Sequence, residues 1–423
     1  MNEPGGAAHH AVRDGTLDQL MRVSAAVASA ILALTALARA DVAPRAVSLR
    51  DALSAAGVAP KHQTAVAQRV AADAAVPAAG AWPATTIGVS TTYRTFRLGL
   101  GASLPLPIFG TLEANRGVAR AEADIASTEV RAVDLELRRD VTKAWVELAR
   151  AEARAELSER SAKREEELAT ITQKRVDSGD ASKAEAVQAN AAARRARAEA
   201  GADRTAIAAA SADLAAALGW DPDVLLHADG GFPALVDVPG YEQLSLSRAG
   251  HPEIRAAKAR VAVEAARADE AHALRWPHLA LDVETDVADR TNEDKNDYRV
   301  GLTLELPLLG HTAAAEQAAR AHRAAAQVEH DATLIALDGQ IVAAHRRYEA
   351  GRQRVKTLED DVLPAQREAA TLARAAYQEG QGGLVTVLEA DRSLTDVERE
   401  AIEARADAAS ALADLRWAAG GAL

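Results

Sequence analysis

The chain has 423 residues, a formal net charge of −12 and no cysteine. The lack of cysteine excludes a disulfide framework, a thiolate metal site and a lipid anchor on an N-terminal cysteine, and the acidic balance argues against a nucleic-acid-binding protein. Aromatic residues make up only 3% of the chain, so long helices packed through small side chains are favoured over one compact core.

The first 40 residues predict an export signal. Met21-Arg22 precedes an apolar run over residues 23–37, which ends at Ala38-Arg39-Ala40. A basic residue, an apolar run and a small-x-small pattern are typical of a secretory signal peptide, and the run is too short to span a bilayer. We expect residues 1–40 to be an N-terminal extension and signal peptide, with the mature chain starting near residue 41. The alternative is a buried N-terminal helix.

Two amphipathic strands follow an Ala-rich helical segment over residues 48–75. Apolar residues alternate with small or polar residues from Ile87 to Arg94 and again from Phe96 to Pro107. This period of two predicts strands with one apolar face. We therefore expect a two-stranded hairpin within about 84–107.

A very long helix is predicted next. Between Val118 and Ser178 there is neither Gly nor Pro, and Ala, Glu, Arg and Leu dominate; these are the best helix formers. As one helix this run would be roughly 90 Å long. We expect helices over 111–178 and 183–218, joined by a sharp turn at Gly179.

The same pattern occurs twice. Gly301 repeats Gly101 at a shift of 200 positions, and Gly380 repeats Gly179 at a shift of 201. The chain therefore divides into repeat 1, residues 41–240, and repeat 2, residues 241–423. In repeat 2 we expect strands over about 278–307 and helices over 311–378 and 384–418, with kinks or breaks at Gly339, Gly351 and especially Pro364.

The predicted strands have the length and alternation of transmembrane β-strands, about ten residues with lipid on one face and water on the other. The alternative is a soluble sheet packed on helices. Charge on the polar faces and aromatic residues near the strand ends favour the membrane. The residues expected to line a barrel lumen are Arg94, Arg97, Asp282, Glu284, Asp286, Arg299 and Glu305.

The four predicted strands of one chain cannot close a barrel, and open sheet edges are not tolerated in lipid. Two chains would give about eight strands and a lumen filled by side chains, whereas three would give about twelve and leave room for a channel. The expected fold class is mixed α and β, with two internal repeats and a twelve-stranded transmembrane β-barrel shared by a trimer.

The sequence resembles the TolC-like outer membrane efflux protein family over about residues 48–420. The run Leu104-Pro105-Leu106-Pro107-Ile108-Phe109, the nearby Asn115-Arg116-Gly117 and the missing lipid-anchor cysteine look most like the branch that serves cobalt–zinc–cadmium cation pumps. The other motifs that carry the resemblance are His251-Pro252-Glu253-Ile254, Glu305-Leu306-Pro307-Leu308, Val362-Leu363-Pro364, Tyr377-Gln378-Glu379-Gly380 and Val387-Leu388-Glu389-Ala390-Asp391.

The resemblance implies a protein of the cell outer membrane whose barrel continues into a long α-helical barrel in the periplasm. It implies a homotrimer in outer-membrane lipid. It also implies two partners, a periplasmic adaptor (membrane fusion protein) and an inner-membrane pump of the resistance-nodulation-division type.

By the same resemblance, the helical turns farthest from the strands form the tip that docks on the adaptor, at Gly179, Ser182, Gly380 and Gly383. Residues just past these turns narrow the periplasmic entrance and form a gate, at Glu185, Thr386 and Glu389. The sequence departs from the family pattern at Thr386, where a carboxylate is expected. The alternative is that Glu185 and Glu389 are solvated acids on the helix surface.

The most consistent function is a passive exit duct for substrate, with heavy-metal cations as the expected cargo, and not an enzyme. The sequence shows no catalytic constellation, phosphate loop or metal-ligand cluster, so we expect no cofactor. Two alternatives remain open: the same fold serving drug efflux or type I secretion, and a soluble periplasmic coiled-coil scaffold.

Overall fold

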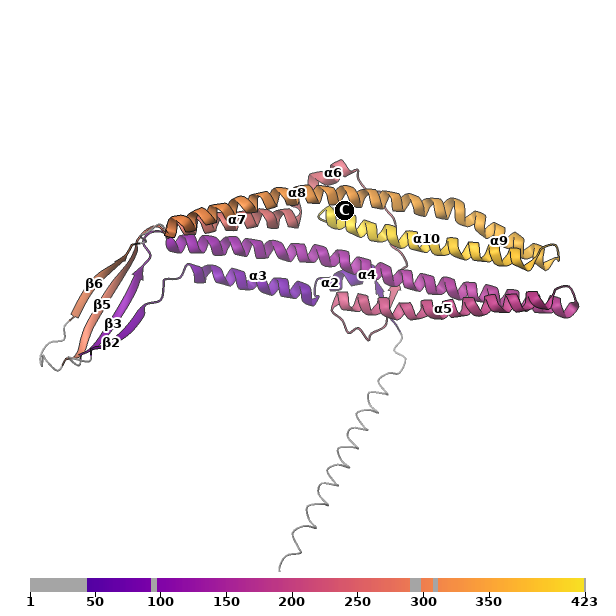
Figure 1. The fold of residues 1–423 in the computed structure, drawn as a ribbon, viewed down its shortest axis with the longest axis horizontal. Coiled ribbons are helices and arrows are strands. Elements are labelled where there is room, and N and C mark those ends of the chain that lie inside the picture. The colour runs from indigo at the N-terminus through magenta and orange to yellow at the C-terminus, as the bar shows by residue number, and fades with distance from the viewer. Residues whose placement is uncertain (1–43, 93–96, 290–297, 307–310, 422–423) are drawn as a thin grey trace, which may run out of the picture.

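The computed structural model describes residues 44–92, 97–289, 298–306 and 311–421. The predicted signal peptide, residues 1–40, and Arg94 lie outside the described residues. The described chain is a long helical body with a small sheet at one end, set at an angle to the helices (Figure 1).

The elements follow the twofold repeat. The first half contains β1 (Arg45–Ser48), α2 (Leu49–Ala56), α3 (Pro60–Ala79), β2 (Thr86–Thr92), β3 (Arg97–Leu106), α4 (Thr111–Ser178), α5 (Lys183–Leu218) and β4 (Leu226–Asp229). The second half contains α6 (Tyr241–Leu246), α7 (Pro252–Ala273), β5 (His278–Asp289), β6 (Tyr298–Glu305), α8 (His311–Thr357), α9 (Leu363–Gln378) and α10 (Leu384–Ala418). A 3₁₀ turn, Ser247–Gly250, leads into α7.

Helix α4 runs the length of the helical body. It has 68 residues, which corresponds to about 100 Å. Helices α3, α5, α7 and α10 all pack against it, so segments from both repeats share this one helix as a support (Figure 1). In the described part of the chain, no helix has both the length and the hydropathy that crossing a membrane requires.

The main sheet has the order β2-β3-β5-β6, and every neighbouring pair is antiparallel. The central pair, β3 and β5, joins the two repeats. Strands β2 and β6 are the outer edges, and in the described chain each pairs on one side only. A second sheet, in which β1 pairs in parallel with β4, was not predicted from the sequence.

The helix expected over 311–378 is not continuous. A π-helix, Leu358–Val362, separates α8 from α9. Pro364 lies in the first turn of α9, directly after the π-helix. Proline has no N–H to donate, so one backbone hydrogen bond is missing at this junction. The sequence therefore predicted the place of the break, and the structure shows that it takes the form of a π-helix.

Gly339 and Gly351, where a kink or break was expected, do not break the helix, because both residues lie inside α8. Gly351 instead permits a close approach between two helices. A Cβ atom at Gly351 would lie 3.3 Å from the Cβ of Ala408 on α10, which is tighter than ordinary van der Waals contact. The glycine here serves packing and not flexibility.

Each repeat has its own apolar core near the middle of the body. In repeat 1, the buried Trp145 on α4 donates its indole N–H to the carbonyl oxygen of Val47 at 2.9 Å, which fixes β1 against the helix. In repeat 2, the buried Tyr348 on α8 donates its hydroxyl to the carbonyl oxygen of Val236. One buried aromatic donor thus anchors a non-helical segment in each core.

His251 explains the motif that opens repeat 2. Its Nδ1 accepts from the backbone N–H of Glu253 at 3.2 Å and so caps α7, while Nε2 lies 3.0 Å from the carbonyl oxygen of Trp417 near the end of α10. The neutral tautomer protonated at Nε2 satisfies both contacts. The side chain is buried, and it ties the start of the repeat to its last helix.

Candidate functional site

The far end of the helical body is built from two matching turns, which we call the tip: residues 179–183 and 380–383. Gly179 has φ +87° and Gly380 has φ +79°, the left-handed region that favours glycine. The N–H of Asp180 bonds to the carbonyl oxygen of Arg175 at 2.8 Å, and the N–H of Gly179 bonds to that of Val176 at 3.1 Å. These two bonds are the Schellman arrangement that ends a helix.

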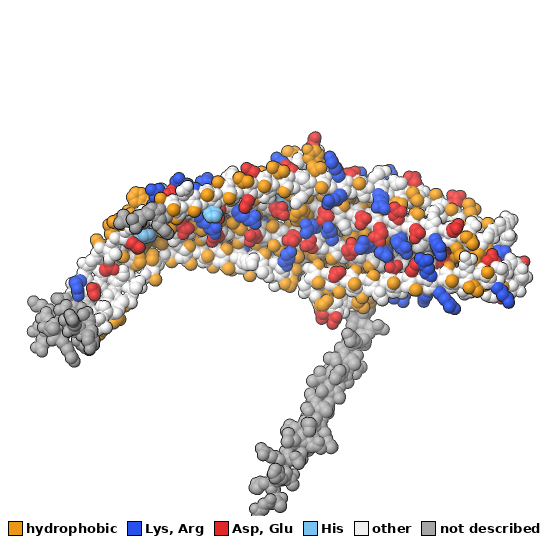
Figure 2. Space-filling model, in the orientation of Figure 1, with side chains coloured by type: hydrophobic (Ala, Val, Ile, Leu, Met, Phe, Trp, Pro, Cys, Tyr) orange, Lys and Arg blue, Asp and Glu red, His pale blue; other side chains and the backbone are white. Residues whose placement is uncertain are grey.

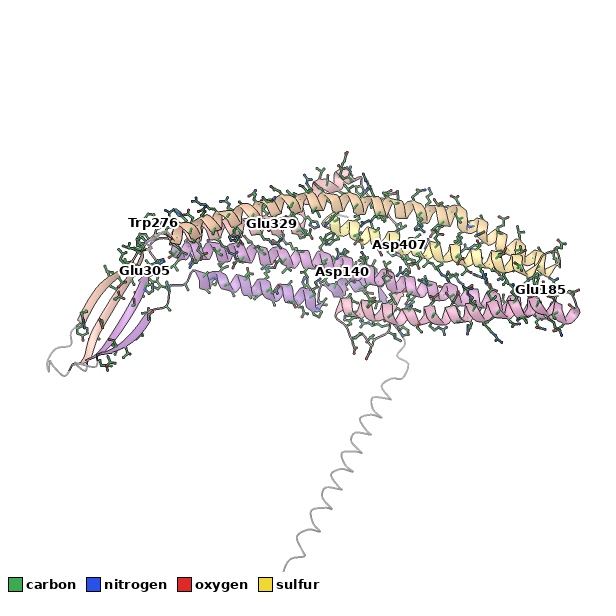
Figure 3. The ribbon with its side chains drawn as sticks, viewed as in Figure 1. Asp140, Glu185, Trp276, Glu305, Glu329 and Asp407 are labelled. Carbon is green, nitrogen blue, oxygen red and sulfur yellow. The ribbon has the colours of Figure 1, made fainter. Side chains whose placement is uncertain are left out.

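The two turns restart their helices differently. The Ser182 hydroxyl accepts from the N–H of Glu185 at 3.2 Å, and the Glu185 carboxylate accepts from the N–H of Ser182 at 2.8 Å. This is a capping box, and Figure 3 shows Glu185 at this end of the molecule. In repeat 2, Gly383 occupies the N-cap position of α10 and provides no side-chain cap.

The residues expected to form the gate therefore differ in their surroundings. Glu185 is half-buried and its carboxylate is engaged by the capping box. Thr386 occupies the matching third position of α10 and is exposed. Glu389 lies one turn further along α10 and is also exposed. These residues lie near the tip of one chain, while their position relative to a tunnel remains a prediction.

Arg175 joins the two turns of the tip. Its guanidinium lies 4.5 Å from the centre of the Tyr377 ring and donates to the Tyr377 carbonyl oxygen. It also donates to the carbonyl oxygen of Asp180 at 3.3 Å. The Tyr377 hydroxyl is 3.0 Å from the hydroxyl of Thr172 on α4, and both side chains are buried. One cation and one aromatic ring thus hold the tip of repeat 1 to the tip of repeat 2.

A buried ion pair lies above the tip. Arg374 on α9 donates to Asp391 on α10 through Nε at 3.0 Å and Nη2 at 2.7 Å. Asp391 is only 2% exposed. A two-pronged guanidinium–carboxylate contact has the geometry that makes buried pairs tolerable, so it fixes the angle between the two helices.

On the face shown in Figure 2, acidic and basic side chains mix along the middle of the helical body toward the tip.

At the opposite end, the strand register sorts the side chains of the sheet onto two faces. Asp282 is opposite Ser103, Glu284 is opposite Arg299, and directly opposed residues share a face. One face therefore holds charged, hydroxyl and glycine residues. The other face holds Ile87, Val89, Leu98, Leu100, Leu104, Leu279, Leu281, Val283, Val300, Leu302 and Leu304.

The charged residues expected in the lumen are placed as follows. Asp282 and Glu284 on β5, with Arg299 and Glu305 on β6, share the polar face. Arg97 and Asp286 belong to β3 and β5 by their backbone, and their side chains are outside the described part of the structure. Whether this face lines a lumen remains a prediction.

The junction between sheet and helices contains a compact charged cluster. Glu316 on α8 is 4% exposed; it accepts from Arg275 at 2.8 Å, lies 3.3 Å from His272 and also pairs with Arg320. The hydrogen bond from Arg275 is the largest cause that lowers the pKa of Glu316.

Next to this cluster, the rings of Phe109 and Trp276 stack at 5.7 Å with an interplanar angle of 11°. Figure 3 places Trp276 and Glu305 close to the point where the sheet meets the helices. Stacked, exposed aromatic rings are typical of a membrane interface.

Comparison with known proteins decides the family. The sequence model of the outer membrane efflux protein family matches residues 78–220 and 243–421. The chain belongs to the outer membrane efflux protein family. The predicted family resemblance is therefore confirmed, and the chain is an outer membrane efflux channel, since the family and its fold are those of channel proteins and not of enzymes.

Individual relatives are distant. The cobalt-zinc-cadmium resistance protein CzcC of Cupriavidus metallidurans is 24% identical over 297 residues, which cover 69% of each chain. The outer membrane protein VceC of Vibrio cholerae superposes with a TM-score of 0.73 at 22% identity, covering 88% of this chain and 96% of VceC. CusC, whose structures were described in connection with transmembrane channel formation, superposes with a TM-score of 0.75 at 19% identity, covering 88% of this chain and 92% of CusC. These structures establish the fold.

Sequence reasoning missed several residues that support the tip, among them Arg175, Tyr377, Arg374 and Asp391. Two of them stand inside motifs that carried the family resemblance, Tyr377 in Tyr377-Gln378-Glu379-Gly380 and Asp391 at the end of Val387–Asp391. A recurrent motif on an otherwise Ala-rich helix was the available signal. Their partners lie on other helices, so the role of each residue became visible only in the fold.

Proposed function

We propose that three copies of this chain form the outer-membrane channel of a tripartite efflux system, with the helical body in the periplasm. The sheet carries this proposal. Its apolar face is exposed, for example 70% at Val89 and 71% at Val300, and its outer strands β2 and β6 leave unpaired edges in the described chain. Lipid tolerates such a face but not such edges, so further copies must close the sheet, and about twelve strands leave a channel.

The helical body supports the same assembly. Helices α3 and α8 lie along opposite long edges of the body (Figure 1). Each exposes large apolar side chains, 61% at Val70 on α3 and 69% and 75% at Val328 and Ile335 on α8. A ring of copies joined through β2 and β6 would bring α3 of one copy beside α8 of the next. These side chains would then be covered, and the barrel would continue into a helical tunnel.

In this proposal the channel is passive, and a pump of the resistance-nodulation-division type supplies the energy through a periplasmic adaptor. The adaptor docks at the tip, on Gly179, Ser182, Gly380 and Gly383. Glu185, Thr386 and Glu389 then lie at the entrance. The matched geometry of the two turns supports this arrangement. With two similar hairpins in each copy, a trimer would present a ring of about six.

We infer that the cargo consists of heavy-metal cations. The similarity to CzcC, a protein named for cobalt, zinc and cadmium resistance, supports this inference. Carboxylates on the polar face of the sheet, such as Asp282, Glu284 and Glu305, would favour cations over anions in a narrow pore. A deletion strain that loses resistance to organic toxicants but keeps resistance to zinc, cobalt and cadmium would contradict the cargo and leave the channel intact.

The channel itself is tested by extraction and reconstitution. The protein should leave the membrane only with detergent, run as a trimer of mature chains, and show stepwise conductance in planar bilayers. Release of a monodisperse monomer by osmotic shock would contradict the proposal and favour the periplasmic scaffold.

A further inference from the structure

A polar layer separates two apolar clusters where the α4–α5 hairpin packs on α10. The cluster toward the tip includes Leu168 and Leu384, and the cluster toward the middle of the body includes Leu148. Between them, Ser161 on α4 meets Thr395 on α10, with their hydroxyl oxygens 3.2 Å apart. Polar groups therefore contribute to the contact between the two repeats over this stretch, beside the buried Ala162 and Leu394.

Glu165 is the anomaly of this layer. It is 7% exposed, and its Oε2 atom is buried without a hydrogen-bond partner in the described chain. Two neighbouring guanidinium groups are engaged with other carboxylates, since Arg374 holds Asp391 at 2.7 Å and Arg164 lies 3.4 Å from Glu398. A third, Arg392, lines the cavity beside Glu165. A buried carboxylate oxygen with no hydrogen-bond partner disfavours the charged form of the group.

Burial and one neighbouring charge act in the same direction on the pKa of Glu165. Burial is the largest cause that raises the pKa of Glu165 above its ordinary value of 4.5, and the neighbouring Asp391 raises it further. Arg374, Arg392 and Arg164 oppose the shift without cancelling it. Glu165 is therefore an acid that the fold favours in its protonated state.

Water has a route to this carboxyl group. A cavity of about 160 Å³ lies beside Glu165, with room for about five water molecules. The α5 side of the cavity carries Arg195 and Glu199, which pair at 3.2 Å. The α10 side carries Arg392, Asp396 and Arg399, and Arg399 is 3.6 Å from Asp396 and 3.9 Å from Glu199.

We propose that Glu165 is a proton-operated latch between the α4–α5 hairpin and the α9–α10 hairpin. When protonated, its side chain is neutral and the polar layer stays closed. When deprotonated, its charge beside Asp391 draws water in through the cavity and loosens the contact between α4 and α10. The folded chain binds this proton more tightly than the unfolded chain, so the stabilisation is complete at acid pH and falls as the pH rises above 4.5 and through the folded pKa.

The consequence for transport rests on the proposed function. The two hairpins end in the tip, which in that proposal surrounds the periplasmic entrance. A closed polar layer then holds the entrance narrow in acid, and deprotonation of Glu165 lowers the barrier to its widening.

The first test uses stability and does not depend on channel activity. Glu165→Gln is compared with wild type and with Glu166→Gln, which changes the exposed neighbouring acid, by thermal unfolding of the purified full-length protein between about pH 5 and pH 8. The Tm of the wild type and of Glu166→Gln should fall as the pH rises. Glu165→Gln should lack this loss and gain about 1–3 °C at the upper end. An unchanged pH dependence in Glu165→Gln would overturn the latch.

The second test measures conductance of the same proteins in planar bilayers. Wild type and Glu166→Gln should open more often as the pH rises, whereas Glu165→Gln should stay at the acid level throughout. Equal pH dependence in all three proteins would refute the latch while leaving the channel proposal standing. The absence of conductance in all three would contradict the channel proposal, and the stability test would then decide the latch alone.

Discussion

Arg175 lies with its guanidinium 4.5 Å from the centre of the Tyr377 ring, and the two residues belong to different repeats. The same guanidinium reaches the carbonyl oxygens of Tyr377 and Asp180. The two turns at the end of the molecule are therefore one mechanical unit. A partner that binds one turn must act on both.

The first prediction follows from this contact. Arg175→Ala should weaken the tip by about 1–3 kcal/mol, because it removes two hydrogen bonds to carbonyl oxygens and a cation–π contact. Limited proteolysis should then cut faster near residues 176–183, and cleavage elsewhere should keep its rate. Lys174→Ala, which changes the exposed neighbour, is the control and should behave like wild type. Equal cleavage in both variants would mean that the turns are held by their apolar contacts alone.

The second prediction separates docking from folding at the tip. Gly179→Val or Gly380→Val places a β-branched residue at positive φ, which is strained, although open space surrounds Gly179. We expect the trimer to insert and efflux resistance to be lost, because the turn no longer fits the adaptor.

An adaptor pull-down on the folded variants measures that loss directly. Gly201→Val is the control, because Gly201 lies inside α5 in open space and its φ is not positive. Undiminished adaptor binding by the tip variants would refute docking at these turns. Failure of the tip variants to fold would show that the glycines serve only to end the helices.

Local chemistry explains which parts of the fold could be predicted. Val118–Ser178 contains no helix breaker, and α4 runs through this whole segment as one helix. The period of two in Phe96–Pro107 predicts a strand with one apolar face, and the register of β3 shows that face directly. By contrast, β1 pairs with β4, which lies far along the chain, and the contact of Trp145 with Val47 also joins distant segments. Such pairings leave no periodic trace in either segment.

The tip and the helices that lead to it divide in the same way between residues that could be predicted and residues that could not. Gly179 and Gly380 could be identified, because a glycine at the end of a long helix predicts a left-handed turn. Glu165 and Asp391 could not, because an acid on an Ala-rich helix is ordinarily solvated. Only the packing of α4, α9 and α10 shows that these two carboxylates are buried.

The third prediction concerns the junction of sheet and helices. The fold lowers the pKa of Glu316 from its ordinary value of 4.5, chiefly through the hydrogen bond from Arg275. Glu316 therefore stabilises the fold above pH 4.5, and this contribution is lost as the pH falls through the folded pKa. Glu316→Gln should flatten the acid limb of a Tm–pH curve. Glu329→Gln, which changes an exposed acid on the same helix (Figure 3), should leave it unchanged; equal curves for both variants would mean that Glu316 contributes nothing to acid stability.

The fourth prediction uses the absence of cysteine from the chain. Leu302 and Thr303 are neighbours on β6 and lie on opposite faces of the sheet. In intact cells, a small charged maleimide should label Thr303→Cys from a water-filled lumen and should not label Leu302→Cys, which would face lipid. The parent chain has no thiol and provides the blank. Reversed labelling would place the charged residues Asp282, Glu284 and Arg299 outside the barrel, and equal labelling would indicate a soluble sheet.

The last prediction concerns the gate. Three copies of Glu389 around one axis would repel anions and concentrate cations at a narrow entrance. Glu185 should contribute less, because the capping box with Ser182 engages its carboxylate, and Thr386 brings no charge. Glu389→Gln should therefore lower cation selectivity and weaken block by multivalent cations in single-channel recordings, without a change in trimer stability.

Thr386→Glu is the matched variant in the opposite direction. It adds a carboxylate one turn before Glu389 on α10, so it should raise cation selectivity and strengthen the block. The double variant Glu185→Gln with Glu389→Gln should have nearly the same cation selectivity as Glu389→Gln alone. The Glu185 carboxylate is already engaged by the backbone N–H of Ser182. If selectivity is unchanged in all of these variants, the acids are solvated side chains on the helix surface and the entrance is narrowed by other residues.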